Sequence, residues 1–216
     1  MSEFLDASLR GYLDRLASAD AVPGGGSAAG LAGAMAAALL CMAARFTVGR
    51  PRYAAFQQEA DAALAAAEVR RDELQMLLER DAEAYAHYRA ASALPKSSAE
   101  EQSARHAALQ SATKASALAP MEIARACVGV LALAERLAAH CNPHLVSDVA
   151  VAAEQALSAF RSAALNVRIN LASIEDAGFV EPLAHELRLL QAQAAASAQA
   201  ALETAYQIMQ LSKDGA

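Results

Sequence analysis

Residues 21–44 read AVPGGGSAAGLAGAMAAALLCMAA and contain no charged side chain. The stretch opens with the loop residues Pro-Gly-Gly-Gly-Ser at 23–27. It continues mainly in alanine, the strongest helix former, because alanine loses no side-chain entropy. The run is long enough to cross a bilayer, but segments dominated by Ala and Gly partition weakly into membranes. We therefore predict a helix buried on all sides in a soluble bundle, with no membrane partner.

The rest of the chain has the same character. Hydrophobic residues make up 56% of it and aromatics only 5%, and no period-two alternation indicates a strand. Prolines at 23, 51, 95, 120, 143 and 182 separate segments whose apolar residues have helical spacing. These segments predict helices over 2–18, 27–48, 52–92, 98–120, 145–173 and 181–212, with Pro120 either kinking the fourth or starting another that ends at 139. We expect an all-α bundle of six to seven long helices, with tight alanine-rich packing, as a single domain over residues 1–216.

Charge and cysteine content exclude several classes of protein. The net charge of −6 and the lack of a Lys/Arg run argue against a nucleic-acid partner, which needs a basic face. Three widely spaced cysteines favour reduced thiols in the cytoplasm, and the acidic N-terminus is unlike a signal peptide. The segment from His140 to His144 matches no zinc spacing and is interrupted by a proline, so we interpret it as a helix end and expect no metal site.

The glycine-rich start of the alanine helix admits two interpretations. Unpaired N–H groups at a helix N-terminus attract anions and carbonyl oxygens, and Gly24, Gly25 and Gly26 would let a ligand approach the backbone closely. A tight inter-helix turn explains the same residues. No strand precedes them, which weakens the formal match to a dinucleotide-binding fingerprint.

Three other groups of polar residues lie in apolar surroundings. Asp81, Tyr85 and Tyr88 share one helix face, and the aromatics indicate that this face is at least half buried, where a carboxylate is costly unless it is paired or functional. Asp148 follows the break between helices that Asn-Pro at 142–143 predicts, and an aspartate at such a position is commonly a helix N-cap. Asn166 and Asn170 project from one face four residues apart and need hydrogen-bond partners if buried, which a ligand could supply.

Taken in sequence order, these elements resemble one family over about residues 4–209. Pro-Gly-Gly-Gly-Ser at 23–27, Asp-Ala-Glu-Ala-Tyr at 81–85, Leu-Pro-Lys at 94–96, Ser-Asp at 147–148 and the two asparagines are similar to the folate cyclodeaminase/cyclohydrolase family. Its members are the cyclodeaminase half of formiminotransferase-cyclodeaminase and free-standing bacterial methenyltetrahydrofolate cyclohydrolases. The chain departs from the family pattern at Cys-Asn-Pro 141–143, where Gly-Asn is usual, and at the arginine-containing turn 49–53.

The resemblance implies an all-helical, usually homodimeric enzyme that acts on one-carbon tetrahydrofolates without a metal or redox cofactor. It places the catalytic aspartate at Asp81. It also implies a folate site formed by the residues Gly24, Gly25, Gly26, Ser27, Lys96, Asp148, Asn166 and Asn170.

Both family reactions meet at the methenyl cation that bridges two folate nitrogens. The cyclohydrolase adds water to it and opens the ring to 10-formyltetrahydrofolate, whereas the cyclodeaminase forms it with loss of ammonia. Either needs one carboxylate in a partly desolvated pocket for general acid/base catalysis. The chain shows no formiminotransferase segment, which favours the cyclohydrolase. The alternatives are the cyclodeaminase and a non-catalytic folate-binding module.

Overall fold

The computed structural model describes residues 4–211, in which six α-helices and two short 3-10 helices occur and no strand does. This confirms the predicted all-α bundle. The helices are α1 (Leu9–Leu16), α2 (Gly25–Arg45), α3 (Gln57–Ser92), α4 (Ala99–Ala138), α5 (Val146–Leu171) and α6 (Ala177–Leu211), and the 3-10 helices are η1 (Pro51–Phe56) and η2 (Pro143–Leu145).

Several predicted boundaries hold because local caps fix them. The Ser98 hydroxyl accepts from the Glu101 N–H while the Glu101 carboxylate accepts from the Ser98 N–H, which is a complete capping box at the start of α4. Asn142 accepts from the His144 N–H and begins η2, so the segment around it is a helix end, as predicted.

Three predicted helix starts are wrong. The helix predicted from 52 begins at Gln57, because the separate 3-10 helix η1 occupies the residues before it. The first helix begins only at Leu9, because Ser8 accepts the Gly11 N–H and caps it there. The last helix begins at Ala177 instead of 181, because Asp176 caps it by accepting the Phe179 N–H. Pro182 therefore lies inside α6. Residues 2, 3 and 212 of the predicted helices lie outside the described range.

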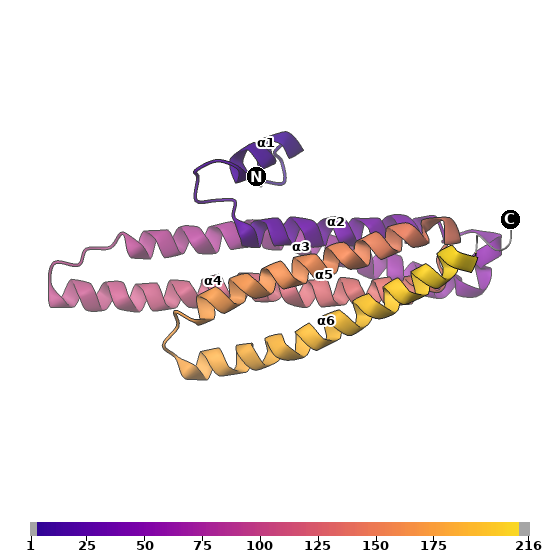
Figure 1. Ribbon diagram of the computed structural model, residues 1–216. Coiled ribbons are helices and arrows are strands. Elements are labelled where there is room, and N and C mark those ends of the chain that lie inside the picture. The colour runs from indigo at the N-terminus through magenta and orange to yellow at the C-terminus, as the bar shows by residue number, and fades with distance from the viewer. Residues whose placement is uncertain (1–3, 212–216) are drawn as a thin grey trace.

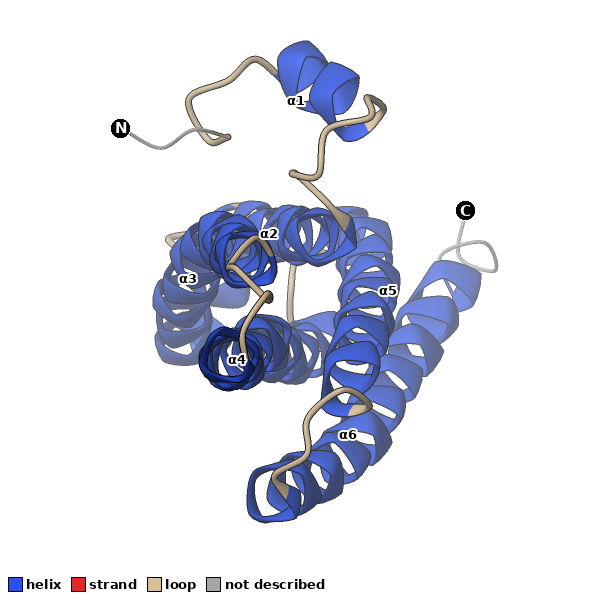
Figure 2. Cartoon of the chain, turned by 90° about the vertical axis from the view of Figure 1, so that its left-hand side faces the viewer, coloured by secondary structure: helices blue, strands red, loops and turns tan. Residues whose placement is uncertain are grey.

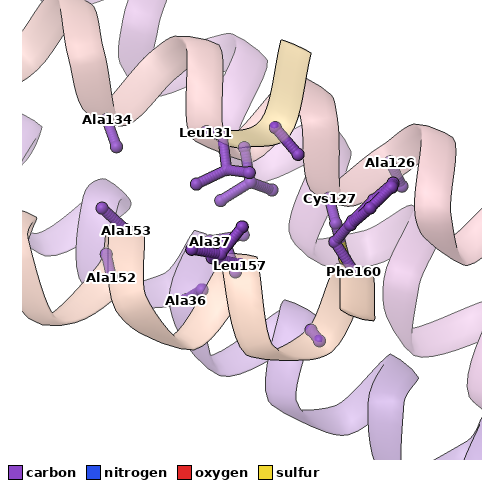
Figure 3. Close-up of a cluster of buried hydrophobic side chains, with 14 of the residues drawn as sticks. Ala36, Ala37, Ala126, Cys127, Leu131, Ala134, Ala152, Ala153, Leu157 and Phe160 are labelled. Atoms are coloured by element: carbon purple, nitrogen blue, oxygen red, sulfur yellow. The ribbon is translucent and has the colours of Figure 1, made fainter. Parts of the chain in front are cut away.

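Four long helices surround the core. Viewed from the end, α2, α3, α4 and α5 form a ring, α6 crosses the outside next to α5, and α1 lies apart above α2 (Figures 1 and 2). Alanines and a few larger side chains from α2, α4 and α5 face one another inside the ring (Figure 3). At Gly30 a Cβ atom would lie 3.2 Å from the Leu78 Cα, so α2 and α3 approach each other at backbone distance. Tight small-residue packing is therefore confirmed.

The charge-free stretch forms the buried helix α2, but its burial is not complete on every side. Because α2 is itself one wall of the ring, its outward face keeps an exposed stripe, with Met35 45% and Phe46 47% exposed and Ala38 exposed between them. By length and composition, α2 and α4 could each cross a membrane. Their apolar windows are nevertheless 61% and 67% buried inside the protein, which is typical of core helices.

The N-terminal segment is held by one small cluster. Phe4 and Tyr12 pack edge to face, with ring centroids 6.1 Å apart, against Leu78 and Ala82 of α3. The backbone N–H of Phe4 also donates to the Glu79 carboxylate at 2.7 Å. These contacts place α1 over the N-terminal end of α2.

Candidate active site

A cavity of about 430 Å³ opens where the N-terminal end of α2 meets the middle of α3 and α4 and the last turns of α5. Among the described residues that line it, one side chain is charged, the carboxylate of Asp81. The other polar or aromatic groups come from the ends or faces of four helices: Gly24, Gly25 and Gly26 at the start of α2, Tyr85 and Tyr88 on α3, Thr113 and Ser116 on α4, and Asn166, Asn170 and the following Ser173 on or just after α5.

The carboxylate of Asp81 packs directly against the glycine-rich turn. A Cβ atom on Gly26 would lie 2.2 Å from Oδ1 of Asp81, which is too close for two non-bonded atoms. Only glycine therefore fits here while Asp81 keeps its position. The backbone N–H of Ser27, at the third position of α2, lies near the same carboxylate and lowers its pKa. Asp81 therefore lies against the N-terminus of α2 from the neighbouring helix, where the helix dipole favours a negative charge. The close-packing interpretation of the glycines is confirmed at Gly26, and their role in binding a ligand stays a prediction.

Ser27 itself lies behind the cavity. It is fully buried, and its hydroxyl donates to the Leu78 carbonyl at 3.1 Å, which ties α2 to α3. Ser27 does not line the cavity, and its backbone is the part that lies near Asp81, so its role in a folate site stays a prediction. This hydrogen bond satisfies the Ser27 hydroxyl, because a buried donor without a partner costs free energy.

Burial raises the pKa of Asp81 above the ordinary aspartate range, and the Ser27 N–H opposes part of this rise. Between the ordinary and the raised pKa, the folded protein binds more protons at this group than the unfolded chain does. The contribution of Asp81 to the free energy of unfolding therefore falls as the pH rises through this window. Asp81→Asn should remove this contribution, so that the variant gains stability relative to wild type as the pH rises above the ordinary aspartate pKa of about 3.9.

Urea unfolding of both proteins at several pH values measures this difference, and the other carboxylates cancel in the subtraction. Parallel pH profiles for wild type and variant would contradict a raised pKa at Asp81.

Tyr12 lies next to this carboxylate and was not predicted from the sequence. It is 4% exposed, and its hydroxyl, close to Ser27, makes no hydrogen bond of normal geometry to a described residue. Burial raises the pKa of Tyr12, the Ser27 side chain lowers it and the Asp81 charge raises it further. Position 12 is 69 residues from Asp81 in the chain, and no local pattern links the two.

The predicted face of α3 lines the cavity and, as expected, is more than half buried. Tyr85 and Tyr88 are 41% and 37% exposed and stack on each other with ring centroids 6.1 Å apart. They lie at the cavity wall, one and two turns beyond Asp81. They stay partly exposed because the cavity separates them from the opposite helices. The pair offers an aromatic surface to a flat ligand ring.

The two asparagines present acceptors to the cavity. Asn166 Nδ2 donates to the Ser162 carbonyl, and Asn170 Nδ2 donates to the carbonyls of Asn166 and Ser116, at 2.9 and 2.7 Å. No described donor reaches either Oδ1 atom, which leaves both available to a ligand. Ser116 precedes Pro120 by four residues, and Pro120 has no N–H to offer that carbonyl. Asn170 supplies the missing donor, which accounts for the unbroken course of α4 through Pro120.

This constellation can be compared with known proteins. A family profile described as formiminotransferase-cyclodeaminase matches residues 8–189. The chain belongs to this family. It is 38% identical over 193 residues to a Methylorubrum extorquens protein named methenyltetrahydrofolate cyclohydrolase, a match that covers 89% of this chain and 93% of that one.

Other formiminotransferase-cyclodeaminase relatives are similar over the same region. The Mus musculus formimidoyltransferase-cyclodeaminase is 33% identical over 187 residues, which are 86% of this chain and 34% of the mouse protein. The crystal structure of formiminotetrahydrofolate cyclodeaminase from Thermotoga maritima superposes with a TM-score of 0.86 at 32% identity, covering 96% of this chain and all of that one.

Two residues that the family resemblance placed at the folate site do not line this cavity. Lys96 is exposed in the loop between α3 and α4 and borders a second hollow. Asp148 lies in the first turn of α5, about 27 Å along the helix from Asn166 at 1.5 Å per residue. The fold therefore does not bring Lys96 or Asp148 to the cavity that holds Asp81.

No described group of three or more His, Cys, Asp or Glu side chains could hold a metal ion. Cys41, Cys127 and Cys141 are free thiols and buried. Burial raises the pKa of Cys127 to about 12 and that of Cys141 to about 11, so both stay protonated and unreactive at neutral pH.

Proposed function

We propose that this protein is a 5,10-methenyltetrahydrofolate cyclohydrolase in which Asp81 is the general acid and base. The observation that carries the proposal is the half-buried Asp81 carboxylate, fixed against Gly26 in a cavity with an aromatic wall and two free amide oxygens. The 38% identity to a named methenyltetrahydrofolate cyclohydrolase, over nearly the full length of both chains, supports the choice of substrate.

The proposed reaction uses Asp81 twice. Water adds to the carbon of the methenyl cation, and the Asp81 carboxylate accepts a proton from it, which leaves a neutral tetrahedral adduct. The protonated carboxyl then gives its proton to N5 as the bond between the carbon and N5 breaks. The adduct hydroxyl loses its proton to solvent, and the formyl group stays on N10. A raised pKa suits this exchange, because efficient acid/base groups titrate near the working pH.

The rest of the cavity would bind and orient the substrate. An ionised Asp81 attracts the methenyl cation, and the oxygens of Asn166 and Asn170 can accept N–H groups of the pterin edge. Tyr85 and Tyr88 would stack on a ring of the folate. The proposed steps are proton transfers, so they call for no metal or redox cofactor. The free, buried thiols suit a cytoplasmic location.

The second candidate is the cyclodeaminase reaction, which the likeness to the Thermotoga maritima cyclodeaminase favours. Purified protein supplied separately with methenyltetrahydrofolate and formiminotetrahydrofolate separates the two. Accelerated loss of the methenyl absorbance with formation of 10-formyltetrahydrofolate supports the cyclohydrolase. Gain of that absorbance with release of ammonia supports the cyclodeaminase, and no change with either substrate leaves a folate-binding module.

We also propose that two copies pair through the outer stripe of α2. Met35, Ala38, Met42 and Phe46 recur at helical spacing on this face, and two of them are large and nearly half exposed. Analytical ultracentrifugation should show a dimer for the wild type and a shift toward monomer for Met35→Glu. A monomeric wild-type protein would contradict the pairing.

A further inference from the structure

The proline inside α4 lies one helical turn beyond the cavity wall. Pro120 is buried, and Ser116, four residues before it, lines the cavity together with Asn170 of α5. We propose that Pro120 is a positioning residue for substrate binding: it leaves the Ser116 carbonyl without a backbone donor and so fixes the Asn170 amide with its oxygen free for the substrate. This inference rests on the proposed function, because it takes the ligand that Asn170 accepts from to be a folate.

The gap in the hydrogen bonds of α4 follows from the chemistry of proline. In an α-helix each carbonyl accepts from the N–H four residues later, and proline has no N–H. The Ser116 carbonyl therefore has no partner within α4, although the helix continues to Ala138. A carbonyl that is partly shielded from water and unpaired costs free energy, so a donor from outside the helix stabilises this position.

The proline inside α6 shows that such a donor is not always required. Pro182 leaves the carbonyl of Gly178 without its helical partner. Gly178 is exposed, so water can satisfy that carbonyl. The Ser116 carbonyl instead lies at the contact between α4 and α5, where the Asn170 side chain reaches it. At Pro120 the missing donor is therefore supplied by a side chain of the candidate site.

This arrangement uses the donor end of the Asn170 amide completely. Nδ2 donates to the Ser116 carbonyl at 2.7 Å and to the Asn166 carbonyl, one turn earlier on α5, at 2.9 Å. Turning the amide over would place its oxygen against two carbonyl oxygens, which have no hydrogen to donate. The amide is therefore fixed in one orientation, and its oxygen, which no described donor reaches, stays available as an acceptor at the cavity.

Ser116 extends the link to the aromatic wall of the cavity. Its hydroxyl donates to the Ala84 carbonyl of α3 at 3.4 Å, and Ala84 directly precedes Tyr85. Ser116 therefore joins α3 and α5 at the level of the cavity. In Pro120→Ala a new backbone N–H would compete for the Ser116 carbonyl. The Asn170 amide would then lose hold of the shorter of its two contacts.

The first test separates binding from turnover. Pro120→Ala should raise KM for methenyltetrahydrofolate about three- to tenfold, the size of one hydrogen bond, and should keep kcat within about twofold, because Asp81 is untouched. Kd for 10-formyltetrahydrofolate, measured by calorimetry, should rise by the same factor. Val130→Ala removes the same number of carbons from a buried position further along α4 and should leave KM and Kd unchanged. Wild-type KM and Kd in Pro120→Ala would overturn the proposal.

The second test reads the link without substrate. Asn170→Ala should lower the urea midpoint of unfolding in the wild-type background, because it removes the donor of the Ser116 carbonyl. The same change should lower the midpoint less in Pro120→Ala, whose helix supplies its own N–H. Equal losses in the two backgrounds would show that Pro120 does not act through Asn170 and would also overturn the proposal.

The two tests separate this proposal from the proposed function. A wild-type protein that neither converts nor binds a folate refutes the proposed function. Unequal losses in the unfolding experiment would in that case still assign the positioning of the Asn170 amide to Pro120.

Discussion

Asp81→Asn is expected to lower kcat for methenyltetrahydrofolate hydrolysis by about 10²- to 10⁴-fold, the usual contribution of a positioned acid/base group. The amide keeps the shape of the carboxyl group, so it fits the space that Gly26 leaves. It cannot accept the proton of the attacking water or return it to N5. Far-UV circular dichroism should be unchanged, because the helices are held by alanine packing elsewhere.

Glu83→Gln is the matched control for this variant. Glu83 lies two residues from Asp81 on α3, is exposed and does not line the cavity. It should keep wild-type turnover. Near-normal activity in Asp81→Asn, with Glu83→Gln also active, would remove Asp81 from the mechanism.

Gly26→Ala is expected to be the most damaging small substitution at the site. The added methyl group would lie 2.2 to 2.5 Å from the carboxyl atoms of Asp81, so the carboxylate must move away from the Ser27 N–H. A displacement of about 1 Å at a catalytic group can cost 10²-fold in rate, and overpacking costs about 1–3 kcal/mol of stability. Steady-state kinetics and thermal unfolding measure the two effects.

Gly33→Ala separates steric damage from loss of catalysis. Gly33 lies two turns further along α2, and a Cβ atom there would be 3.0 Å from Cys127 Sγ and from a Leu74 methyl group. The variant should also lose stability but should keep most of its kcat at a temperature where it is folded. If Gly26→Ala retains full activity, Asp81 does not need its place at the α2 N-terminus.

Much of the fold could be predicted because its signals are local. Prolines and serine caps mark most helix ends, and the alanine content predicts the close packing of the ring. Pro120 shows the limit of such signals. Whether a proline breaks a helix depends on whether another donor satisfies the carbonyl four residues before it. Here that carbonyl belongs to Ser116, and its donor is Asn170, 54 residues away in the chain. Sequence spacing carries no information on that contact.

Part of the site was also predictable from local signals. Asp81, Tyr85 and Tyr88 share a face by simple helical periodicity, and they do line the cavity. The partner of Gly26 could not be foreseen, because periodicity cannot tell whether a glycine admits a ligand or a neighbouring side chain. Lys96 and Asp148 were placed by family resemblance, and the helix lengths put them elsewhere in the fold.

A single-turnover reaction tests the central claim most directly. Methenyltetrahydrofolate is mixed with excess protein, and the decay of its ultraviolet absorbance is followed against buffer alone, so that product release does not enter. The account predicts a decay well above the buffer rate with wild type and a decay close to the buffer rate with Asp81→Asn. Equal acceleration by the two proteins, or no acceleration by the wild type, would contradict it.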